Sequence, residues 1–422
     1  MDPASYRPIS LLATQSKLFE AMLLPTIRRH FTPRPEQFGF RSEHSTSLQL
    51  SRVLHDVVFA LNKKEVAAAV FLDMEKAFDR VWHAGLVHRL LSSDFPRRVV
   101  AIISSFLSDR RFYVSVEGVK SSYRPIAAGV PQGSCLSPDL YSIYTNDVPV
   151  AAGCAVALYA DDTAYTASSL NARHAASKLQ RSLDALPVWL AERRLTANAA
   201  KTQAIVFGQG RKLPPPLTLQ GAEVQWRPQV TYLGITLDRG LTMRPHVAAA
   251  AGRAKAAAAR LRPVLQSSLP LRHKLALYKA YIRPHLTYAA PAWYALAAET
   301  HRRRLRAVQS TTLRRIVDAP RYVRNATITR DLRQQGLDEF IGELARRMFE
   351  RADASGFQHL QRLAPHHTRP PDHRRAFPRE LVLASACDSY SCGRRFDHRL
   401  SANRLSFYMR MLPSLERRRK TS

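Results

Sequence analysis

The sequence contains only four cysteines in 422 residues, at positions 135, 154, 387 and 392. They are too few and too scattered for the disulfide framework of a secreted protein. No apolar run approaches the roughly 18 residues that a membrane span requires, and no basic-plus-apolar signal segment opens the chain. We therefore expect reduced thiols, no membrane, and an intracellular location in the nucleus, the cytoplasm or both. Cys387 and Cys392 lie near His398, but their spacing matches none of the common structural zinc patterns.

Acidic residues are also scarce. The chain has 33 Asp and Glu against 64 Lys and Arg, for a formal net charge of +31. The excess is uneven, since residues 1–250 carry a net +9 and residues 251–422 a net +22. Arg-rich coding from a GC-biased source would raise the charge everywhere and does not explain this asymmetry. A positive potential of this size attracts phosphate backbones whatever their sequence, so the expected partner is a polyanion.

Two adjacent carboxylates, Asp161 and Asp162, interrupt an apolar run that extends from Ala155 to Tyr165. The pattern predicts two short strands joined by a tight turn that holds the acidic pair. Adjacent aspartates repel each other, and either bulk water or a divalent cation relieves that repulsion. An ordinary exposed turn, in which Asp is common, is the alternative to a metal site.

A second acidic stretch favours the metal site. The apolar run of residues 68–72 ends directly at Asp73, and an amphipathic segment with Phe78, Val81 and Trp82 on one face follows. If Asp73 and Asp161 lie side by side in one sheet, their oxygens can hold a pair of Mg²⁺ ions. Such a pair, about 3.5–4 Å apart, clamps the attacking and leaving oxygens of a phosphoryl transfer.

Hydrophobic periodicity predicts further elements. A core-facing helix is expected over residues 16–31 and one long amphipathic helix over residues 172–190, and from residue 245 onward the pattern is helical. Residues 363–380 are polar and rich in Pro, His and Arg, which predicts a linker or a disordered segment. The apolar residues expected to face the core from the first helix are Leu18, Phe19, Met22, Leu23 and Ile27.

Five motifs in a fixed order carry a family resemblance. They are SYRPISLL at residues 5–12, QFGFR at 37–41, FLDMEKAFD at 71–79, GVPQGSCLSP at 129–138 and YADD at 159–162. Together they resemble the reverse transcriptases of non-LTR (LINE-type) retrotransposons, with the jockey-like insect elements most similar. The resemblance covers about residues 3–320. Because residues 1–6 enter the first motif at once, we expect the chain to be truncated at its N-terminus, without the strands that precede this motif in the family.

The resemblance implies an α+β right-hand polymerase. Incomplete fingers would span residues 1–65, and a palm built on an antiparallel sheet would span residues 66–240. A helical thumb is expected over residues 241–355, and a basic, partly disordered C-terminal extension over residues 356–422. The reverse transcriptase domain itself would cover about residues 3–237.

It also implies an enzyme, a nucleotidyltransferase that copies RNA into DNA and so supports transposition. A primer 3′-hydroxyl attacks the α-phosphate of a dNTP and releases pyrophosphate, with two Mg²⁺ ions as cofactor. Asp73 and Asp161 would ligate both ions, Asp162 would assist, and the carbonyl of Met74 would complete one coordination sphere. The implied partners are an RNA template, a DNA primer and the dNTPs.

Four further residues take expected roles from their places in the family motifs. Arg7 would touch the incoming triphosphate, and Gln132 would lie near the nucleotide and the template. Phe78 would block a ribose 2′-hydroxyl, although ordinary apolar packing also accounts for it. Lys201 is the candidate general acid for the pyrophosphate leaving group, with a phosphate-neutralising or merely solvated lysine as the alternatives.

Basic side chains suggest where nucleic acid binds. Arg41 is expected to contact the template backbone, with plain solvation as the alternative. The arginines of residues 301–317 form a face of one sign, which in the family's thumb binds the template–primer duplex, whereas a solvated surface is the other interpretation. These arginines are Arg302, Arg303, Arg304, Arg306, Arg314 and Arg315.

The leading hypothesis is therefore an RNA-directed DNA polymerase of a retrotransposon. A second hypothesis is a catalytically inactive remnant that still binds nucleic acid. The presence of all three aspartates argues for activity, whereas missing fingers strands would weaken nucleotide binding. A third, an RNA-copying RNA polymerase, shares the two-metal chemistry, but Phe78 and the LINE-type motifs argue against it.

Overall fold

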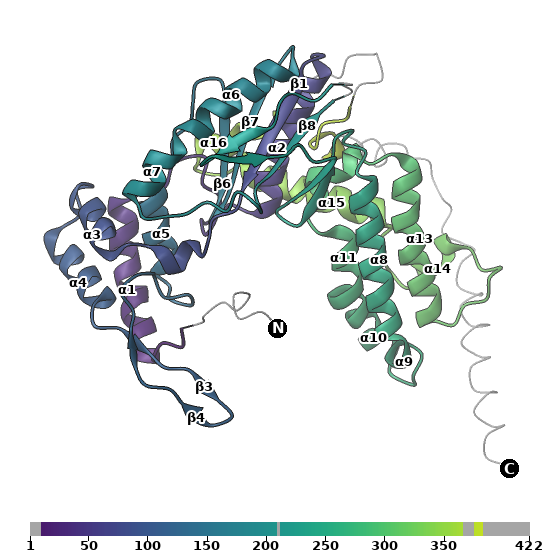
Figure 1. Cartoon of the computed structure of the whole chain (residues 1–422). Helices are drawn as coiled ribbons and strands as arrows, with labels where there is room; N and C mark the ends of the chain where they lie inside the picture. The colour runs from purple at the N-terminus through teal and green to yellow at the C-terminus, as the bar shows by residue number, and fades with distance from the viewer. Residues whose placement is uncertain (1–9, 209–211, 366–374, 383–422) are drawn as a thin grey trace. The chain divides into compact units, whose positions relative to one another are not determined.

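The computed structural model describes residues 10–208, 212–365 and 375–382 (Figure 1). They belong to one compact unit. Arg7 and the cysteines at 387 and 392 lie outside the described residues. Cys135 and Cys154 are free thiols, and among the described helices none combines the length and the hydropathy that crossing a membrane demands.

The largest sheet of the described residues has four strands, all antiparallel, in the order β6-β7-β1-β8. Its strands are β1 (Val66–Leu72), β6 (Ala155–Tyr159), β7 (Asp162–Ser169) and β8 (Gln203–Phe207). Strand β1 is paired along both edges, and its alternate residues enter two different hydrophobic clusters. One cluster contains Ala67, Ala69 and Phe71, and the other contains Ala68, Val70 and Leu72. Burial on both faces explains why this strand is continuously apolar.

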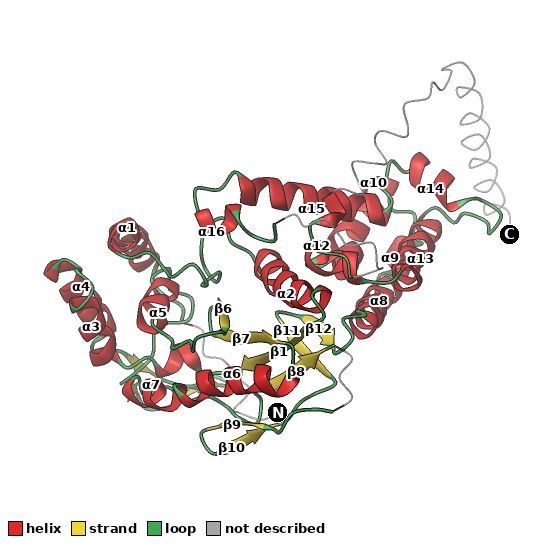
Figure 2. Cartoon of the chain, turned by 90° about the horizontal axis from the view of Figure 1, so that it is seen from above, coloured by secondary structure: helices red, strands yellow, loops and turns green. Residues whose placement is uncertain are grey.

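Helices cover both faces of this sheet (Figure 2). One face packs against α2 (Thr46–Asn62), and the other packs against α6 (Ala172–Asp184). The hydroxyl of Ser45 accepts a hydrogen bond from the Leu48 amide at 3.2 Å and caps α2. The α6 side also carries α1 (Thr14–His30), α3 (His83–Leu91), α4 (Arg97–Leu107), α5 (Ser137–Thr145) and α7 (Leu186–Glu192).

The mixed helix-and-sheet architecture and the antiparallel sheet confirm the predicted fold class. Short strands, and helices from residue 244 onward, complete the described residues. The short strands are β2 (Arg111–Phe112), β3 (Ser115–Val116), β4 (Val119–Lys120), β5 (Arg124–Pro125), β9 (Leu217–Leu219), β10 (Ala222–Val224), β11 (Gln229–Tyr232) and β12 (Ile235–Asp238). The later helices are α8 (Arg244–Arg260), α9 (Arg262–Leu265), α10 (Leu271–Leu277), the π-helical η3 (Tyr278–Ile282), α11 (Arg283–Thr287), α12 (Ala290–Trp293), η4 (Tyr294–Leu296), α13 (Glu299–Ile316), α14 (Asn325–Asp331), α15 (Leu337–Asp353) and α16 (Gln358–Gln361).

The prediction of a single helix over residues 172–190 is wrong. Helix α6 ends at Asp184, and α7 begins at Leu186 with Pro187 in its first turn. A proline has no N–H to donate to the carbonyl of residue 183, and its ring crowds that carbonyl. The amphipathic pattern continues across this break, so periodicity alone did not reveal it.

Helix α1 has the predicted extent but buries a different face. Leu23 and Ile27 are buried as expected, whereas Leu18, Phe19 and Met22 are 65%, 51% and 71% exposed. Glu20 is fully buried instead. The core-facing prediction is therefore wrong for three of its five residues.

Residues 375–382 pack against the core, so the prediction of a linker over residues 363–380 is wrong for the part of this stretch that the structure describes. Asn62 pairs with the backbone of Arg375 through two hydrogen bonds of 3.0 Å. The ring of Phe377 is 3% exposed and lies 5.0 Å from that of His55. The Arg379 guanidinium forms an ion pair with Asp353 and lies over the Phe349 ring. These contacts bind a late segment of the chain to α2 and α15.

We predict that Phe377→Ala lowers the free energy of unfolding by about 3–5 kcal/mol, because it leaves a cavity where a buried ring packed. Urea denaturation followed by tryptophan fluorescence measures the change. Tyr322→Ala is the control, since Tyr322 is 80% exposed and its loss should change stability by less than about 0.5 kcal/mol. Equal midpoints for the two variants would contradict the packing role of Phe377.

Candidate active site

A cleft of about 980 Å³ opens where β1 ends and the β6–β7 turn begins. Its lining includes six of the residues that the sequence singled out, namely Asp73, Met74, Phe78, Gln132, Asp161 and Lys201. They come from four segments of the chain, and the first and the last residue, Asp73 and Lys201, are 128 positions apart in the sequence. Asp162 is exposed beside them, at the first position of β7.

Strand register brings the aspartates together. Leu72 of β1 pairs with Thr163 of β7, so Asp73 and Asp162 lie at the same end of adjacent strands. In the β6–β7 hairpin Tyr159 pairs with Asp162, which leaves Ala160 and Asp161 as a two-residue turn. The predicted hairpin with its acidic turn is confirmed. Burial, with Asp161 and Asp162 nearby, raises the pKa of the Tyr141 hydroxyl, so that this buried group beneath the site stays neutral.

The backbone around Asp73 continues the sheet in irregular form. The Asp73 carbonyl accepts a hydrogen bond of 2.7 Å from the Asn198 amide. Met74 forms an isolated antiparallel bridge with Ala197, and the Glu75 amide donates to the Thr196 carbonyl at 2.9 Å. These bonds carry residues 196–198 to the cleft, and Lys201 follows them with an exposed side chain.

Phe78 lies on the short 3₁₀-helix η2 (Ala77–Arg80) at the side of the cleft. Its ring stacks on Tyr141 with centroids 4.6 Å apart and meets Phe40 edge to face at 5.9 Å. The Val130 amide donates to the Phe78 carbonyl at 2.8 Å. Phe78 is half-buried, so its ring both packs against neighbours and forms part of the cleft wall.

Gln132 occupies the loop that faces η2. Its side-chain Nε2 donates a hydrogen bond to Asp79 Oδ1 at 2.8 Å, and its backbone carbonyl accepts one from the Ser10 amide at 2.8 Å. The loop approaches η2 closely at Gly129, whose φ is +92° and where an added Cβ would lie 2.8 Å from the Asp79 carbonyl oxygen. Glycine is required here on both counts.

Glu20 fixes this loop from α1, and the sequence prediction missed it. Its Oε2 accepts hydrogen bonds from Ser134 Oγ at 2.6 Å and from the Cys135 amide at 2.7 Å. These bonds satisfy a carboxylate that would otherwise be costly to bury. A signal was present, because Glu20, Leu23 and Ile27 have the i, i+3, i+7 spacing of one helix face.

The segment Gln37–Gly39 holds the acidic turn, and it was also missed as part of the site. Gln37 Oε1 accepts hydrogen bonds from the Gly39 amide at 2.8 Å and the Ala160 amide at 3.1 Å. The Phe38 amide donates to the Leu158 carbonyl at 2.9 Å. A Cβ at Gly39 would lie 2.2 Å from the Ala160 nitrogen, so only glycine allows this approach. Ala160 has a φ of +59°, an unfavourable conformation for alanine that these contacts hold in place.

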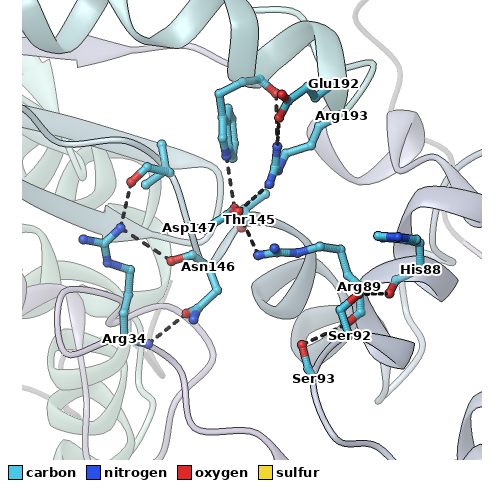
Figure 3. A network of polar contacts seen from close by, with 12 residues as sticks. Arg34, His88, Arg89, Ser92, Ser93, Thr145, Asn146, Asp147, Glu192 and Arg193 are labelled. Atoms are coloured by element: carbon cyan, nitrogen blue, oxygen red, sulfur yellow. Dashed lines mark hydrogen bonds and ion pairs between the residues drawn. The ribbon is translucent and has the colours of Figure 1, made fainter.

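A polar network anchors the start of this segment (Figure 3). The Arg34 amide donates to Asn146 Oδ1 at 2.9 Å, and its guanidinium donates to the Val148 carbonyl at 2.9 Å. Asp147, which follows Asn146, forms an ion pair with Arg89 at 3.0 Å and another with Arg193. Helices α3 and α7 are thereby tied to the chain that supports the acidic turn.

Most of the predicted nucleic-acid-binding arginines make contacts within the protein. Arg41 donates to the Arg34 carbonyl at 3.2 Å and lies over the Phe357 ring, and burial lowers its pKa. Arg302 donates to the carbonyls of Tyr294 and Ala295. Arg303 pairs with Glu299 at 3.2 Å, and Arg306 pairs with Glu299 and with Asp338.

Arg304, unlike these arginines, lines a groove. The groove, of about 760 Å³, lies between α8 and α13 and is also lined by Lys255 and Arg315. The other lining residues include Ala251, Gly252, Ala307 and Thr311. Small side chains between exposed cations make this groove accessible to a phosphate backbone.

The cleft lining suits a hard cation. It presents the carboxylates of Asp73 and Asp161 and includes neither His nor Cys. Among the described residues there is no group of three or more His, Cys, Asp or Glu side chains that could hold a metal ion by themselves. Mg²⁺ commonly binds through one or two carboxylates and takes its other oxygens from water and substrate phosphates, so the donor set fits this ion.

Comparisons with known proteins agree with this geometry. The family model described as "Reverse transcriptase (RNA-dependent DNA polymerase)" matches residues 2–237. The chain is 38% identical to the RNA-directed DNA polymerase from mobile element jockey of Drosophila melanogaster, over 83% of this chain and 40% of that protein. It is 35% identical to the probable RNA-directed DNA polymerase from transposon X-element of the same organism, over 91% of this chain and 43% of that protein. The chain thus spans less than half the length of these relatives.

A solved structure of telomerase from Candida tropicalis, in complex with a fragment of telomeric RNA, matches with a TM-score of 0.41 and 14% identity. The match covers 83% of this chain and 53% of that one.

We predict that Gln37→Leu accelerates hydrogen exchange at the Ala160 amide by about tenfold, because one partly buried hydrogen bond worth about 1–1.5 kcal/mol is lost. Exchange resolved to single amides by NMR or mass spectrometry measures it. Gln37→Glu keeps the Oε1 acceptor and should restore most of the protection. Unchanged exchange in Gln37→Leu would refute the role of this side chain in holding the turn.

Proposed function

Because the chain belongs to the reverse transcriptase family, we propose that it is an RNA-directed DNA polymerase of a non-LTR retrotransposon. It transfers deoxynucleoside monophosphates from dNTPs to a primer 3′-hydroxyl on an RNA template. The observation that carries the proposal is the convergence of Asp73 and Asp161 in one cleft with Phe78, Gln132 and Lys201. Within this proposal residues 1–65 belong to the fingers, 66–240 to the palm and 241–355 to the thumb.

The acidic residues hold the cofactor. Asp73 and Asp161 would ligate two Mg²⁺ ions, with Asp162 assisting and the Met74 carbonyl completing one coordination sphere. When bound, the ions supply Lewis-acid stabilisation of the charge that develops on the phosphate oxygens. The role of the protein is to keep the carboxylates in position, and the β1–β7 register and the Gln37 contacts support this role.

The nucleotide lies against Phe78 and Gln132. The aromatic wall of Phe78, braced by Tyr141 and Phe40, leaves little room beside the sugar and so selects deoxyribose. Gln132 is held by Asp79 at the edge where the nucleotide meets the template. Arg7 is proposed to contact the triphosphate.

Lys201 is the proposed general acid. Its side chain is exposed at the cleft, and an ammonium there can donate a proton to the leaving pyrophosphate oxygen. The backbone amide of Lys201 donates to Asn198 Oδ1 at 3.1 Å. Asn198 also donates to the Asp73 carbonyl, so the acid and the metal-binding segment are joined by one short loop.

The template–primer duplex is proposed to bind the groove between α8 and α13. Lys255, Arg304 and Arg315 line this groove and can neutralise phosphates of either strand. In this proposal Arg302, Arg303 and Arg306 contribute mainly by stabilising the helices, since their guanidinium groups already bond within the protein. Arg41, which is half-buried and lines a cavity together with Phe40, is proposed to contact the template backbone.

We predict that Asp161→Asn lowers primer extension on an RNA template by about 10³-fold, because a metal-binding charge worth several kcal/mol in the transition state is lost. Incorporation of dNTPs in Mg²⁺ is the measurement. Asp94→Asn is a matched control on an exposed residue with positive φ, and it should extend normally. If neither the parent chain nor the control extends primers while all three bind template–primer, the chain is an inactive nucleic-acid-binding remnant.

We predict that Phe78→Val raises ribonucleotide incorporation relative to deoxyribonucleotide incorporation by about 10- to 100-fold, since a steric contact of about 1–3 kcal/mol is removed. The readout is the ratio of kcat/KM for dNTP and rNTP. Phe106→Val, at another half-buried phenylalanine, controls for lost packing. An unchanged ratio with lowered stability would assign Phe78 to packing alone.

A further inference from the structure

A two-stranded ribbon, residues 111–125, follows α4 in the sequence, and its β3–β4 end projects away from the four-stranded sheet (Figure 1). It consists of the pairs β2–β5 and β3–β4. Arg111 pairs with Pro125 and Phe112 with Arg124, and nearer the tip Ser115 pairs with Lys120. The catalytic cleft as described above includes none of these residues.

Every residue of the ribbon is exposed. Its large side chains include Phe112 at 47%, Tyr113 at 40% and Tyr123 at 68% exposure. An isolated two-stranded ribbon is only marginally stable in water without a packed face. Exposed aromatic residues on such an element therefore point to a binding partner more than to a core.

One face of the ribbon combines aromatic rings with cations. The rings of Tyr113 and Tyr123 meet edge to face at 5.3 Å, and Lys120 Nζ lies 5.2 Å from the Tyr113 ring centre. Arg111 lies two residues before Tyr113 on the same arm of the ribbon, where β2 pairs with β5. No acidic residue shares this face, because the ribbon's one carboxylate, Glu117, lies in the turn between β3 and β4.

We propose that this face, Arg111, Tyr113, Lys120 and Tyr123, binds single-stranded nucleic acid. Rings on an exposed strand provide stacking surfaces for bases, and cations beside them neutralise the phosphates between those bases. The single sign of the charge favours a polyanion over a protein partner. The strand would be the unpaired part of the RNA template, an assignment that rests on the proposed function.

The position of the ribbon in the chain supports its assignment to the unpaired part of the template. At its base the Ile126 amide donates to the Arg110 carbonyl at 2.8 Å. Two residues later Ala128 bridges to Trp82, and the chain then enters the loop that carries Gln132 into the cleft. A template strand held on the ribbon therefore binds to the same continuous segment that contacts the proposed templating position.

The test uses the full chain in EDTA without nucleotides, so that binding is separated from catalysis. Fluorescence anisotropy measures the affinity for a labelled 20-nucleotide single-stranded RNA and for a blunt RNA–DNA hybrid of the same length. The variants are the charge pair Arg111→Gln with Lys120→Gln and the ring pair Tyr113→Leu with Tyr123→Leu. The control pair is Arg173→Gln with Arg181→Gln, which removes the same charge from the outer face of α6.

We expect each ribbon pair to weaken single-strand binding by about tenfold, with less than about twofold loss for the blunt hybrid and for the control pair. The charge pair should also lower the slope of log affinity against log salt by about 1.4. Tyr113→Phe with Tyr123→Phe keeps both rings and should bind like the parent chain, which separates lost stacking from a disrupted ribbon.

Equal affinity of the ribbon variants and the control for single-stranded RNA would overturn the proposal. So would unchanged RNA binding together with a change in oligomeric state on gel filtration, which would assign the face to a second copy of the chain. Primer extension is measured in parallel. Ribbon-dependent RNA binding by a chain that extends no primer would reject the proposed function and the assignment to the template, while single-strand binding by the ribbon would stand.

Discussion

The register between β1 and β7 is the constraint on which the rest of the site depends. A shift of one residue would turn every side chain of β1 to the opposite face and carry Asp73 away from Asp161. The two hydrophobic clusters prevent such a shift, because Ala67, Ala69 and Phe71 fill one and Ala68, Val70 and Leu72 fill the other. Packing on both faces of the sheet thus sets the position of carboxylates that are themselves only half-buried.

Buried polar side chains then hold the loops that packing cannot. Glu20 bonds to the loop that carries Gln132, and Gln37 bonds to the turn that carries Asp161. Each accepts hydrogen bonds from backbone amides of the loop that it holds, so the loss of either side chain removes an acceptor from those amides. The cleft is therefore built by residues of the first 40 positions as much as by its own aspartates.

Sequence patterns predicted the elements that depend on neighbouring residues, and they missed the features that depend on contacts with distant parts of the chain. The strand before Asp73 and the hairpin around Asp161 follow from short-range periodicity, and the family motifs indicated that they meet. The buried face of α1 did not follow, because Leu18, Phe19 and Met22 have helical spacing too. Only the contact of Glu20 with Ser134, 114 positions away, selects the other face. Arginine count likewise predicted a uniformly basic helix, whereas Glu299 and Asp338 neutralise part of it. The polar composition of residues 375–380 concealed Phe377, a single ring whose pocket lies on α2.

The return of residues 375–382 to α2 has a consequence for the order of folding. Asn62 and Arg375 are 313 positions apart, so this contact cannot form until nearly the whole described chain has left the ribosome. At a synthesis rate of about 5–20 residues per second, the surface of α2 around Asn62 remains exposed to solvent for roughly 16–60 s after α2 has been made. During this interval Asn62 and His55 of α2 lack the contacts that Arg375 and Phe377 later provide. This part of the fold is therefore completed only after residues 375–382 have been synthesised.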